Sequence, residues 1–489
     1  MLYNQAMVEV MNNKSKKTGT TSMVRRLNRK QTTAFHETQD FGKLVEKAKK
    51  HNVIEPHFYE QHQVMRGLRH ANGTGVLVGL TDIADVHGYI KVDDRKVPVE
   101  GQLFYRGIDV ADLVKHCQLE KRRGFEETTY LLMFGELPTA TQLKAFEEIL
   151  DSNRTLPRDF TENMILKSPS KDIMNKLQRS ILALYSCDDN PDDVSLSNVL
   201  RQSIQLIARF PTIISYGYQA KAHYYDEKSL YLHAPQPGIG TAENVLHMIR
   251  KDNQYTQSEA EILDLCMVIH AEHGGGNNSA FTNRVVSSSG TDTYSAMAAA
   301  VGSLKGPKHG GANIKVKAMV EDIKENCINW HNRESLRAYL VKILKGEAFN
   351  GEGLIYGMGH AVYTLTDPRA ELLRGKALNL AKEKDSLEMF QLYANIESLT
   401  KEIFKEMKGP DFAICANVDL YSGFVYELLG IPDELYTPLF AAARISGWCA
   451  HRIEQIISDN KIMRPAYKSV STLKEYIPQQ QRDIFMGKK

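Results

Sequence analysis

The feature that most constrains the fold is a nearly continuous run of apolar side chains in the middle of the chain. From Ile262 to Ile269 the residues are almost all isoleucine, leucine, cysteine, methionine or valine. Thr256 and Glu259 ahead of this run have the spacing of a helix capping box, so we predict a helix that begins there and stops at the glycines after His273. A helix with almost no polar face has to be covered on all sides by other elements. The chain is therefore expected to form a large, multi-layered, mostly helical protein.

Two further segments predict packed helices. Residues 294–304 are rich in small side chains, which let neighbouring helices approach closely. Thr437 can cap another helix with Pro438 at its first position, and we expect this helix to continue through Arg444.

Strand character is confined to residues 74–107. Val76–Val78 and Tyr89–Val92 are rich in β-forming residues, and Asp93 and Asp94 supply a turn. The predicted fold class is all-α with a short β-strand region near the N-terminus.

Residues 1–35 differ in composition from the rest of the chain. Seven lysines and arginines stand against one acidic residue, Glu9, among many asparagines, serines and threonines. Such a segment is either a disordered or loosely attached tail or a targeting segment, and it lacks the apolar region of a secretory signal.

The overall composition excludes several classes of function. Apolar residues make up 42% and charged residues 25%, and 61 basic against 59 acidic residues give a net charge of +2. This balance gives no reason to expect nucleic acid or an anionic membrane as a partner, and no run of 18 apolar residues is present to span a bilayer. The six cysteines form no C-x-x-C pair, which argues against a disulfide scaffold or a thiolate zinc site and favours a cytoplasmic location.

Four segments place polar groups among apolar residues or glycines, where chemistry is expected. The first is His270–Ser279, in which His270 and His273 are three residues apart and are predicted to share one helix face. Three glycines follow His273, so the backbone can approach a ligand closely there. The alternative reading of His273 is a satisfied core histidine.

The second segment is Leu304–Asn313, where His309 lies between Gly-Pro and Gly-Gly on a sharp turn. The helix predicted to begin near Ala312 would keep this imidazole neutral, and a neutral imidazole can donate a hydrogen bond to an enolate. The alternative is a helix-breaking turn with an incidental histidine.

The third and fourth segments supply another histidine, an arginine and a carboxylate. Gly351–Arg369 has four glycines before His360 and ends on an arginine that can clamp a carboxylate, but the glycine spacing matches neither a Rossmann nor a P-loop fingerprint. Asp419 stands between Val418 and Leu420, where partial burial would raise its pKa and strengthen it as a base. The alternative reading of Asp419 is a helix cap.

One reaction type uses all of these groups. A carboxylate removes a proton next to a carbonyl, a neutral histidine stabilises the resulting enol, and arginines hold an anionic keto acid. A hypothesis from a different class is a metal-dependent hydrolase with His270, His273, His309 and Asp419 as ligands.

The four segments resemble the citrate synthase family in residue types, order and spacing. The similarity covers about residues 65–470 and is carried by the motifs IHAEHGGGN, GPKHGGAN, GMGHAVY followed by DPR, and NVDLYSG. The earlier segments Phe104–Asp109 and Phe125–Pro138 also look like the family.

The resemblance implies a reaction and a role for each matching residue. Members of the family condense acetyl-CoA with oxaloacetate and hydrolyse the thioester to citrate and CoA. Asp419 would take the methyl proton, His309 would stabilise the enol, and His360 would polarise and protonate the oxaloacetate carbonyl. The implied substrate-binding residues are His273, Arg369, Arg444, Arg464, Phe440 and Asn277, and the implied CoA-binding residues are Gly353, Tyr356, Gly357 and Gly359.

The resemblance also implies an architecture of two helical domains that close over the substrates. The large domain would comprise residues 36–310, with the β region at 74–107, and residues 431–489; the small domain would comprise residues 311–430. The unit would be a homodimer, because Arg464 would act in the site of the second subunit. Acetyl-CoA would be a co-substrate of a reaction of the tricarboxylic acid cycle, with no tightly bound cofactor, no metal, no nucleic acid and no membrane involved.

Two alternatives and two departures accompany the resemblance. A 2-methylcitrate synthase condenses propionyl-CoA with the same residues, and one methylene in the acyl pocket discriminates by only about 1–3 kcal/mol. A non-catalytic relative with a binding or regulatory role is the other alternative. Ala361–Leu365 offers no basic residue to the CoA phosphates, and Lys308 beside His309 either lowers the pKa of that imidazole or points to solvent.

Overall fold

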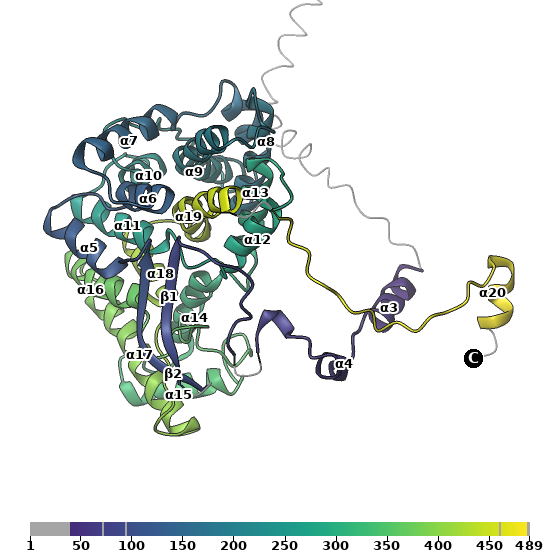
Figure 1. The fold of residues 1–489 in the computed structure, drawn as a ribbon. Helices are drawn as coiled ribbons and strands as arrows, with labels where there is room; N and C mark the ends of the chain where they lie inside the picture. The colour runs from purple at the N-terminus through teal and green to yellow at the C-terminus, as the bar shows by residue number, and fades with distance from the viewer. Residues whose placement is uncertain (1–39, 71–72, 93–94, 459–460, 487–489) are drawn as a thin grey trace, which may run out of the picture. The chain divides into compact units, whose positions relative to one another are not determined.

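The computed structural model describes residues 40–70, 73–92, 95–458 and 461–486, and the chain divides into two compact units (Figure 1). The chain ends, Met1–Gly67 and Tyr467–Lys489, form one unit, whose described helices are α3 (Phe41–His51), α4 (Pro56–Gln61) and α20 (Gln479–Met486). The predicted tail, residues 1–35, and the predicted turn at Asp93 and Asp94 lie outside the described residues. Among the described residues, no helix has the length and apolar character needed to cross a membrane.

The other unit, Leu68–Ala466, contains all four motif segments and is mostly helical. Its α-helices are α5 (Val110–Leu119), α6 (Phe125–Phe134), α7 (Ala140–Asn153), α8 (Ile173–Leu184), α9 (Leu196–Tyr225), α10 (Thr241–Ile249), α11 (Gln257–His270), α12 (Asn278–Ser287), α13 (Thr293–Lys305), α14 (Ala312–Asn326), α15 (Arg333–Leu344), α16 (Pro368–Glu383), α17 (Leu387–Lys408), α18 (Val418–Leu428) and α19 (Tyr436–Ser458). Short turns complete the series: η1 (Arg66–Leu68, at the boundary), η2 (Thr161–Leu166), η3 (Tyr185–Cys187) and η4 (Asp433–Leu435). An antiparallel sheet of β1 (Ala84–Val92), β2 (Arg95–Tyr105) and β3 (Ile108–Asp109), paired in that order, precedes them, which confirms the predicted fold class.

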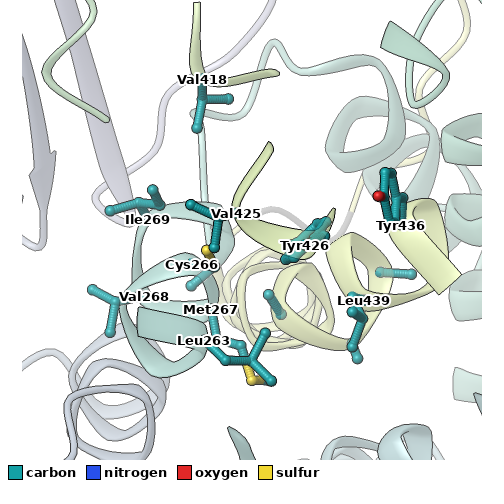
Figure 2. Packing of buried hydrophobic residues seen from close by; sticks show 14 of the residues in the cluster. Leu263, Cys266, Met267, Val268, Ile269, Val418, Val425, Tyr426, Tyr436 and Leu439 are labelled. Carbon is teal, nitrogen blue, oxygen red and sulfur yellow. The ribbon is translucent and has the colours of Figure 1, made fainter. Parts of the chain in front are cut away.

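Helix α19 lies in the middle of the helices that pack against it (Figure 1). It packs against α6, α9, α11, α12 and α13, and nearly every residue from Tyr436 to Ile453 is buried (Figure 1). Side chains of α11, α18 and α19 belong to one buried cluster (Figure 2). Helices α14 to α18 pack among themselves, and α11 also packs against α16. The predicted burial of the apolar run in α11 is confirmed.

The helix boundaries test the capping predictions. The capping box of Thr256 and Glu259 at α11 is present, and α13 occupies the predicted alanine-rich segment. Helix α11 ends at His270, three residues earlier than predicted, and Gly274 beyond it has φ +82°, a conformation that glycine adopts without strain. The prediction for α19 was wrong by a similar margin: the helix begins at Tyr436, and the Thr437 hydroxyl donates to the Gly310 carbonyl at 2.9 Å instead of capping.

The strand prediction is half correct. Tyr89–Val92 lies in β1, as predicted, but Val76–Val78 is not a strand. Leu77 is 85% exposed, and the only bridge in this stretch of described residues joins Arg69 to Gly75. β-forming side chains do not make a strand where no partner strand pairs with them.

The β1–β2 hairpin supports the loop that carries His360. The Gly101 backbone amide donates to Thr366 Oγ1 at 2.9 Å, and the Tyr363 hydroxyl donates to the Gln102 carbonyl at 3.3 Å. A Cβ atom at Gly101 would lie 2.1 Å from the Thr366 carbonyl oxygen and 2.8 Å from the Tyr363 ring. The hairpin and the loop therefore approach each other too closely for any side chain at this position.

We expect Gly101→Ala to destabilise the protein by about 1–3 kcal/mol, because the new methyl group overpacks against the fixed backbone of the loop. The matched control is Gly375→Ala in the interior of α16, where a Cβ atom meets nothing within 4 Å. This substitution should stabilise by roughly 0.5–1 kcal/mol through its effect on helix propensity. Thermal or denaturant unfolding of both variants measures the difference, and equal effects would contradict the close approach.

Candidate active site

Three loops, the start of one helix and the interior of another bring the predicted residues together in the unit Leu68–Ala466. His273 follows α11, His309 lies in the turn between α13 and α14, and His360 lies in the loop before α16. Asp419 is in the first turn of α18, and Arg444 is on α19. These elements are far apart in sequence, so the site exists only once the helices have packed.

His309 is held by a hydroxyl and remains neutral. Its Nε2 atom lies 3.0 Å from Ser279 Oγ, which also accepts a hydrogen bond from Trp448 Nε1 at 3.1 Å. Burial and the nearby charge of Arg444 lower the pKa of His309 to about 4. The predicted neutral state is thus supported, with burial and the charge of Arg444 as its causes. The neighbouring Lys308 is exposed, in agreement with the solvent-facing alternative.

His360 has a defined tautomer. The backbone amides of Val362 and Tyr363 both donate to its Nδ1 atom at 3.1 Å, so the neutral ring carries its proton on Nε2. Burial and the charge of Arg369 lower the pKa of His360 to about 4. The ring also stacks on that of Tyr363, with centroids 4.7 Å apart. His360 is therefore a fixed, neutral hydrogen-bond donor.

His273 meets His360 although it is not on a helix. The ring centroids of the two histidines are 5.1 Å apart in an edge-to-face arrangement. Because α11 ends at His270, the prediction that His270 and His273 share a helix face was wrong. Burial and the charge of Arg369 hold the pKa of His273 well below its ordinary value, and its buried Nε2 atom has no hydrogen-bond partner among the described residues.

Asp419 is a carboxylate poised as a base. Burial raises its pKa to about 6, although Arg369 and Arg444 partly oppose the shift. The Asn417 side chain caps α18 by accepting from the Asp419 amide at 3.0 Å, so the cap is Asn417 and not Asp419. The expected increase in basicity is thus supported, and the alternative reading of Asp419 as a helix cap is not.

Two of the predicted arginines are buried but differ in their partners. Asp367 accepts from Arg369 Nε at 3.0 Å and from Arg369 Nη2 at 2.8 Å, which occupies one edge of the guanidinium. Arg444 donates only from Nε, to the His270 carbonyl at 2.6 Å, and its buried Nη1 and Nη2 atoms have no partner among the described residues. Its guanidinium also lies 4.6 Å from the centre of the Phe440 ring. Unpaired buried donors of this kind fit an anionic ligand.

The glycine loop is tied to the segment that carries Asp419. Met358 and Ala416 form an antiparallel bridge, and the Asn417 amide nitrogen donates to the Gly357 carbonyl at 2.9 Å. A Cβ atom at Gly357 would lie 2.9 Å from Leu420 in α18. The loop backbone of Gly353, Gly357 and Gly359 is in the left-handed region, with φ of +70°, +81° and +87°.

The remaining predicted residues lie at the edges. Tyr356 accepts hydrogen bonds from Lys315 at 3.2 Å and from Asn350 at 3.0 Å. Asn277 accepts from the Ser279 hydroxyl at 2.8 Å and so joins the surroundings of His309. Arg464 is exposed in the extended segment after α19 and is not brought to the other residues within this chain.

Sequence reasoning missed several supporting residues. Ser279 closes the first motif, and Trp448 follows Arg444 by four residues, hence on the same face of α19, which was the available signal. Tyr363 and Asp367 lie within the third motif but were not assigned to the site. No sequence pattern predicted that the β hairpin would contact this loop.

A metal centre is not supported by the arrangement of side chains. Within the described ranges, no group of three histidine, cysteine, aspartate or glutamate side chains is placed to hold a metal ion. His270, His273, His309 and Asp419 therefore do not form the ligand set that a metal-dependent hydrolase would need.

Comparisons with known proteins identify the family to which this chain is similar. The family model described as "Citrate synthase, C-terminal domain" matches residues 70–466. A citrate synthase of Synechocystis sp. is 33% identical over 392 residues, covering 80% of this chain and 90% of the relative, and a 2-methylcitrate synthase of Corynebacterium glutamicum is 31% identical over 428 residues, covering 86% and 99%. The crystal structure of citrate synthase from Thermotoga maritima matches with a TM-score of 0.65 at 30% identity, covering 84% of this chain and 98% of that chain.

We expect Asp419→Asn to stabilise the protein at pH 7.5 by about 1–3 kcal/mol. The folded-state pKa of about 6 lies above the ordinary value of 3.8. Between about pH 4 and pH 6 the folded protein therefore still holds a proton that the unfolded chain has released. The free energy of unfolding falls as the pH rises through this range. Denaturant unfolding should show the full gain at pH 7.5 and a smaller gain at pH 4.5. Asp411→Asn, at an exposed position, is the control. A gain that persists unchanged at pH 4.5 would contradict the raised pKa.

Proposed function

The chain belongs to the citrate synthase family, and from this premise we propose that it condenses acetyl-CoA with oxaloacetate and hydrolyses the resulting thioester to citrate and CoA. The observation that carries the proposal is the half-buried carboxylate of Asp419, with a pKa raised to about 6, in the same site as two neutral imidazoles and a buried arginine with two donors that have no partner among the described residues. A thioester α-proton is a weak acid, so base and donor must act together in a site that excludes water.

The proposed chemistry proceeds in two stages. Asp419 takes a proton from the acetyl methyl group while His309 donates a hydrogen bond to the developing enolate oxygen. The enol carbon then attacks the ketone carbon of oxaloacetate, and the new carbon–carbon bond leaves an alkoxide that receives the Nε2 proton of His360. The proton held by Asp419 then returns to the His360 ring, so both groups recover their starting states. Water finally cleaves the thioester and releases CoA. The tautomer of His360 supports its role, because Nε2 is the nitrogen that carries the proton.

The anionic substrate would be held by groups that have no hydrogen-bond partner within the described part of the chain. Arg444 offers two donors and His273 offers one ring nitrogen, while Arg369 retains its second edge. Phe440 would lie beside the acetyl group, where it contacts Arg444 and the His270 ring at a centroid distance of 4.4 Å. Asn277 would complete the binding set through Ser279.

We also propose that CoA is a co-substrate rather than a tightly bound cofactor. The backbone of Gly353, Gly357 and Gly359 would cover the adenine and pantetheine, with Tyr356 at the edge. The large domain (36–310 and 431–489) and the small domain (311–430) would close over both substrates and exclude water. Six free cysteines support a reducing, cytoplasmic location, where the reaction would serve the tricarboxylic acid cycle.

The second candidate function is 2-methylcitrate synthesis from propionyl-CoA. The relative from Corynebacterium glutamicum carries that name at 31% identity, close to the 33% of the citrate synthase from Synechocystis sp.. The proposed catalytic residues are the same in both reactions, so only substrate preference separates them.

The first test compares acetyl-CoA and propionyl-CoA by the release of free CoA in the presence of oxaloacetate. We expect the higher kcat/KM with acetyl-CoA and a loss of about 10²–10⁴-fold in Asp419→Ala, because the base is removed. Asp411→Ala, at an exposed position, is the control for an indirect effect. A preference for propionyl-CoA would change the product to 2-methylcitrate, and an inactive wild type would overturn the proposal in favour of a non-catalytic relative.

A mixing experiment tests the proposal that Arg464 acts in the second subunit of a homodimer. Asp419→Ala and Arg464→Ala should each be inactive alone, yet a mixed dimer would contain one intact site. Random reassociation makes half of the dimers mixed, so about a quarter of the wild-type activity should return. If Arg464 acts within its own chain, no site is intact and the mixture stays inactive.

A further inference from the structure

A buried carboxylate next to His273 has no role in the proposed reaction. Glu272 is 0% exposed, and its Oε1 atom lies 3.1 Å from Nε2 of His451, which is also 0% exposed. An ionised side chain buried this deeply costs free energy, so its presence calls for a compensating role.

Helix α19 provides a slot for this carboxylate. Arg444, Gly447 and His451 are three and four residues apart and therefore share one face of the helix. A Cβ atom at Gly447 would lie 2.0 Å from Glu272 Oε2 and 2.6 Å from the Ala271 carbonyl oxygen. Only glycine leaves room there, so the carboxylate lies directly against the helix, between Arg444 and His451.

A chain of polar contacts holds the His451 ring through its Nδ1 atom. His451 Nδ1 lies 3.1 Å from Arg284 Nη1, and Arg284 donates from Nη1 to Glu454 Oε2 at 2.5 Å. Because a guanidinium only donates, Nδ1 accepts, and the His451 ring carries its proton on Nε2. This nitrogen and both Glu272 oxygens make no hydrogen bond among the described residues, so the 3.1 Å approach of Nε2 to Oε1 is an electrostatic contact. Glu454 in turn accepts from the Asp82 amide at 2.7 Å.

Tyr105 also holds the backbone of the loop that carries Glu272 and His273. The Tyr105 hydroxyl bridges the Val268 carbonyl at 3.0 Å and the Glu272 carbonyl at 3.1 Å. Burial alone would raise the pKa of Glu272, but His451 and Arg444, together with the backbone amide of His273, hold it below the ordinary value. The carboxylate therefore stays ionised at neutral pH, in the residue next to His273.

We propose that Glu272 is a positioning residue: its side chain lies in the slot at Gly447, 3.1 Å from His451, and so holds the loop in which His273 presents to oxaloacetate an Nε2 atom that has no partner among the described residues. This inference rests on the proposed function and deepens it. Glu272 does not touch the substrate, and its effect passes through His273.

The test uses Glu272→Gln, which keeps the size of the side chain and removes its charge. We expect the KM for oxaloacetate to rise about tenfold, because a misplaced His273 would lose one good hydrogen bond to this substrate. The kcat and the KM for acetyl-CoA should change less than about threefold. The matched control is Glu259→Gln, which removes another buried carboxylate, bound by Arg250 and outside this chain of contacts. It should lower the unfolding temperature similarly and leave the KM for oxaloacetate unchanged.

A double-mutant cycle separates positioning from general destabilisation. In a His273→Gln background, Glu272→Gln should add no further increase in the KM for oxaloacetate, because the residue through which it acts is gone. Multiplied effects in the double variant, or an unchanged KM in the single variant, would overturn the proposal.

Direct titration of oxaloacetate by calorimetry keeps this result distinct from the fate of the proposed reaction. A wild type that binds oxaloacetate without condensing it would overturn the proposed function, while a tenfold weaker Kd in Glu272→Gln would still support the positioning role. If Glu272→Gln does not fold, His451→Gln removes the other half of the contact and should show the same selective loss, and an unchanged Kd in that variant would overturn the proposal.

Discussion

The buried guanidinium of Arg444 is the constraint on which the rest of the site depends. It is 1% exposed and donates only its Nε hydrogen within the described structure, to the His270 carbonyl. Its charge contributes to the lowered pKa values of His309 and His273 and partly opposes the raised pKa of Asp419. A charge can act on several groups at once only where water is excluded, and the central position of α19 supplies that exclusion. The helix that forms the core of the fold is therefore also the helix that sets the electrostatics of the site.

Much of the fold followed from local patterns. The apolar run of α11 predicted a buried helix because no arrangement other than full coverage satisfies it, and the capping box located its start. The ends of helices were predicted less accurately than their centres. Helix α11 stops at His270, because its end depends on the glycines that follow and on the tertiary contacts of the loop. Val76–Val78 failed as a strand for a related reason, since pairing is decided by a partner distant in sequence.

The residues of the site also fall into those that the sequence predicted and those that it did not. His309, His360 and Asp419 were recognisable because motifs carry them, whereas the groups that hold them were not. Ser279 reaches His309 across 30 residues, and Tyr363 reaches the hairpin across 261 residues. Such contacts leave no periodicity in the chain. Gly447 shows the limit most clearly, because its lack of a side chain has meaning only once Glu272 is known to lie against it.

The polar groups without partners tie the stability of the free protein to ligand binding. Each buried donor or acceptor left unpaired costs about 1–3 kcal/mol, and Arg444 and His273 both carry such atoms. The core formed by α11, α18 and α19 offsets this cost through burial of apolar surface. A dianionic keto acid would satisfy the same donors, so the interactions that are missing in the free protein would be regained on binding. Because Arg444 is on α19 and His360 is in the loop before α16, a keto acid that contacts both would draw together the two proposed domains. The buried donors that have no partner among the described residues are thus the ones that would drive closure.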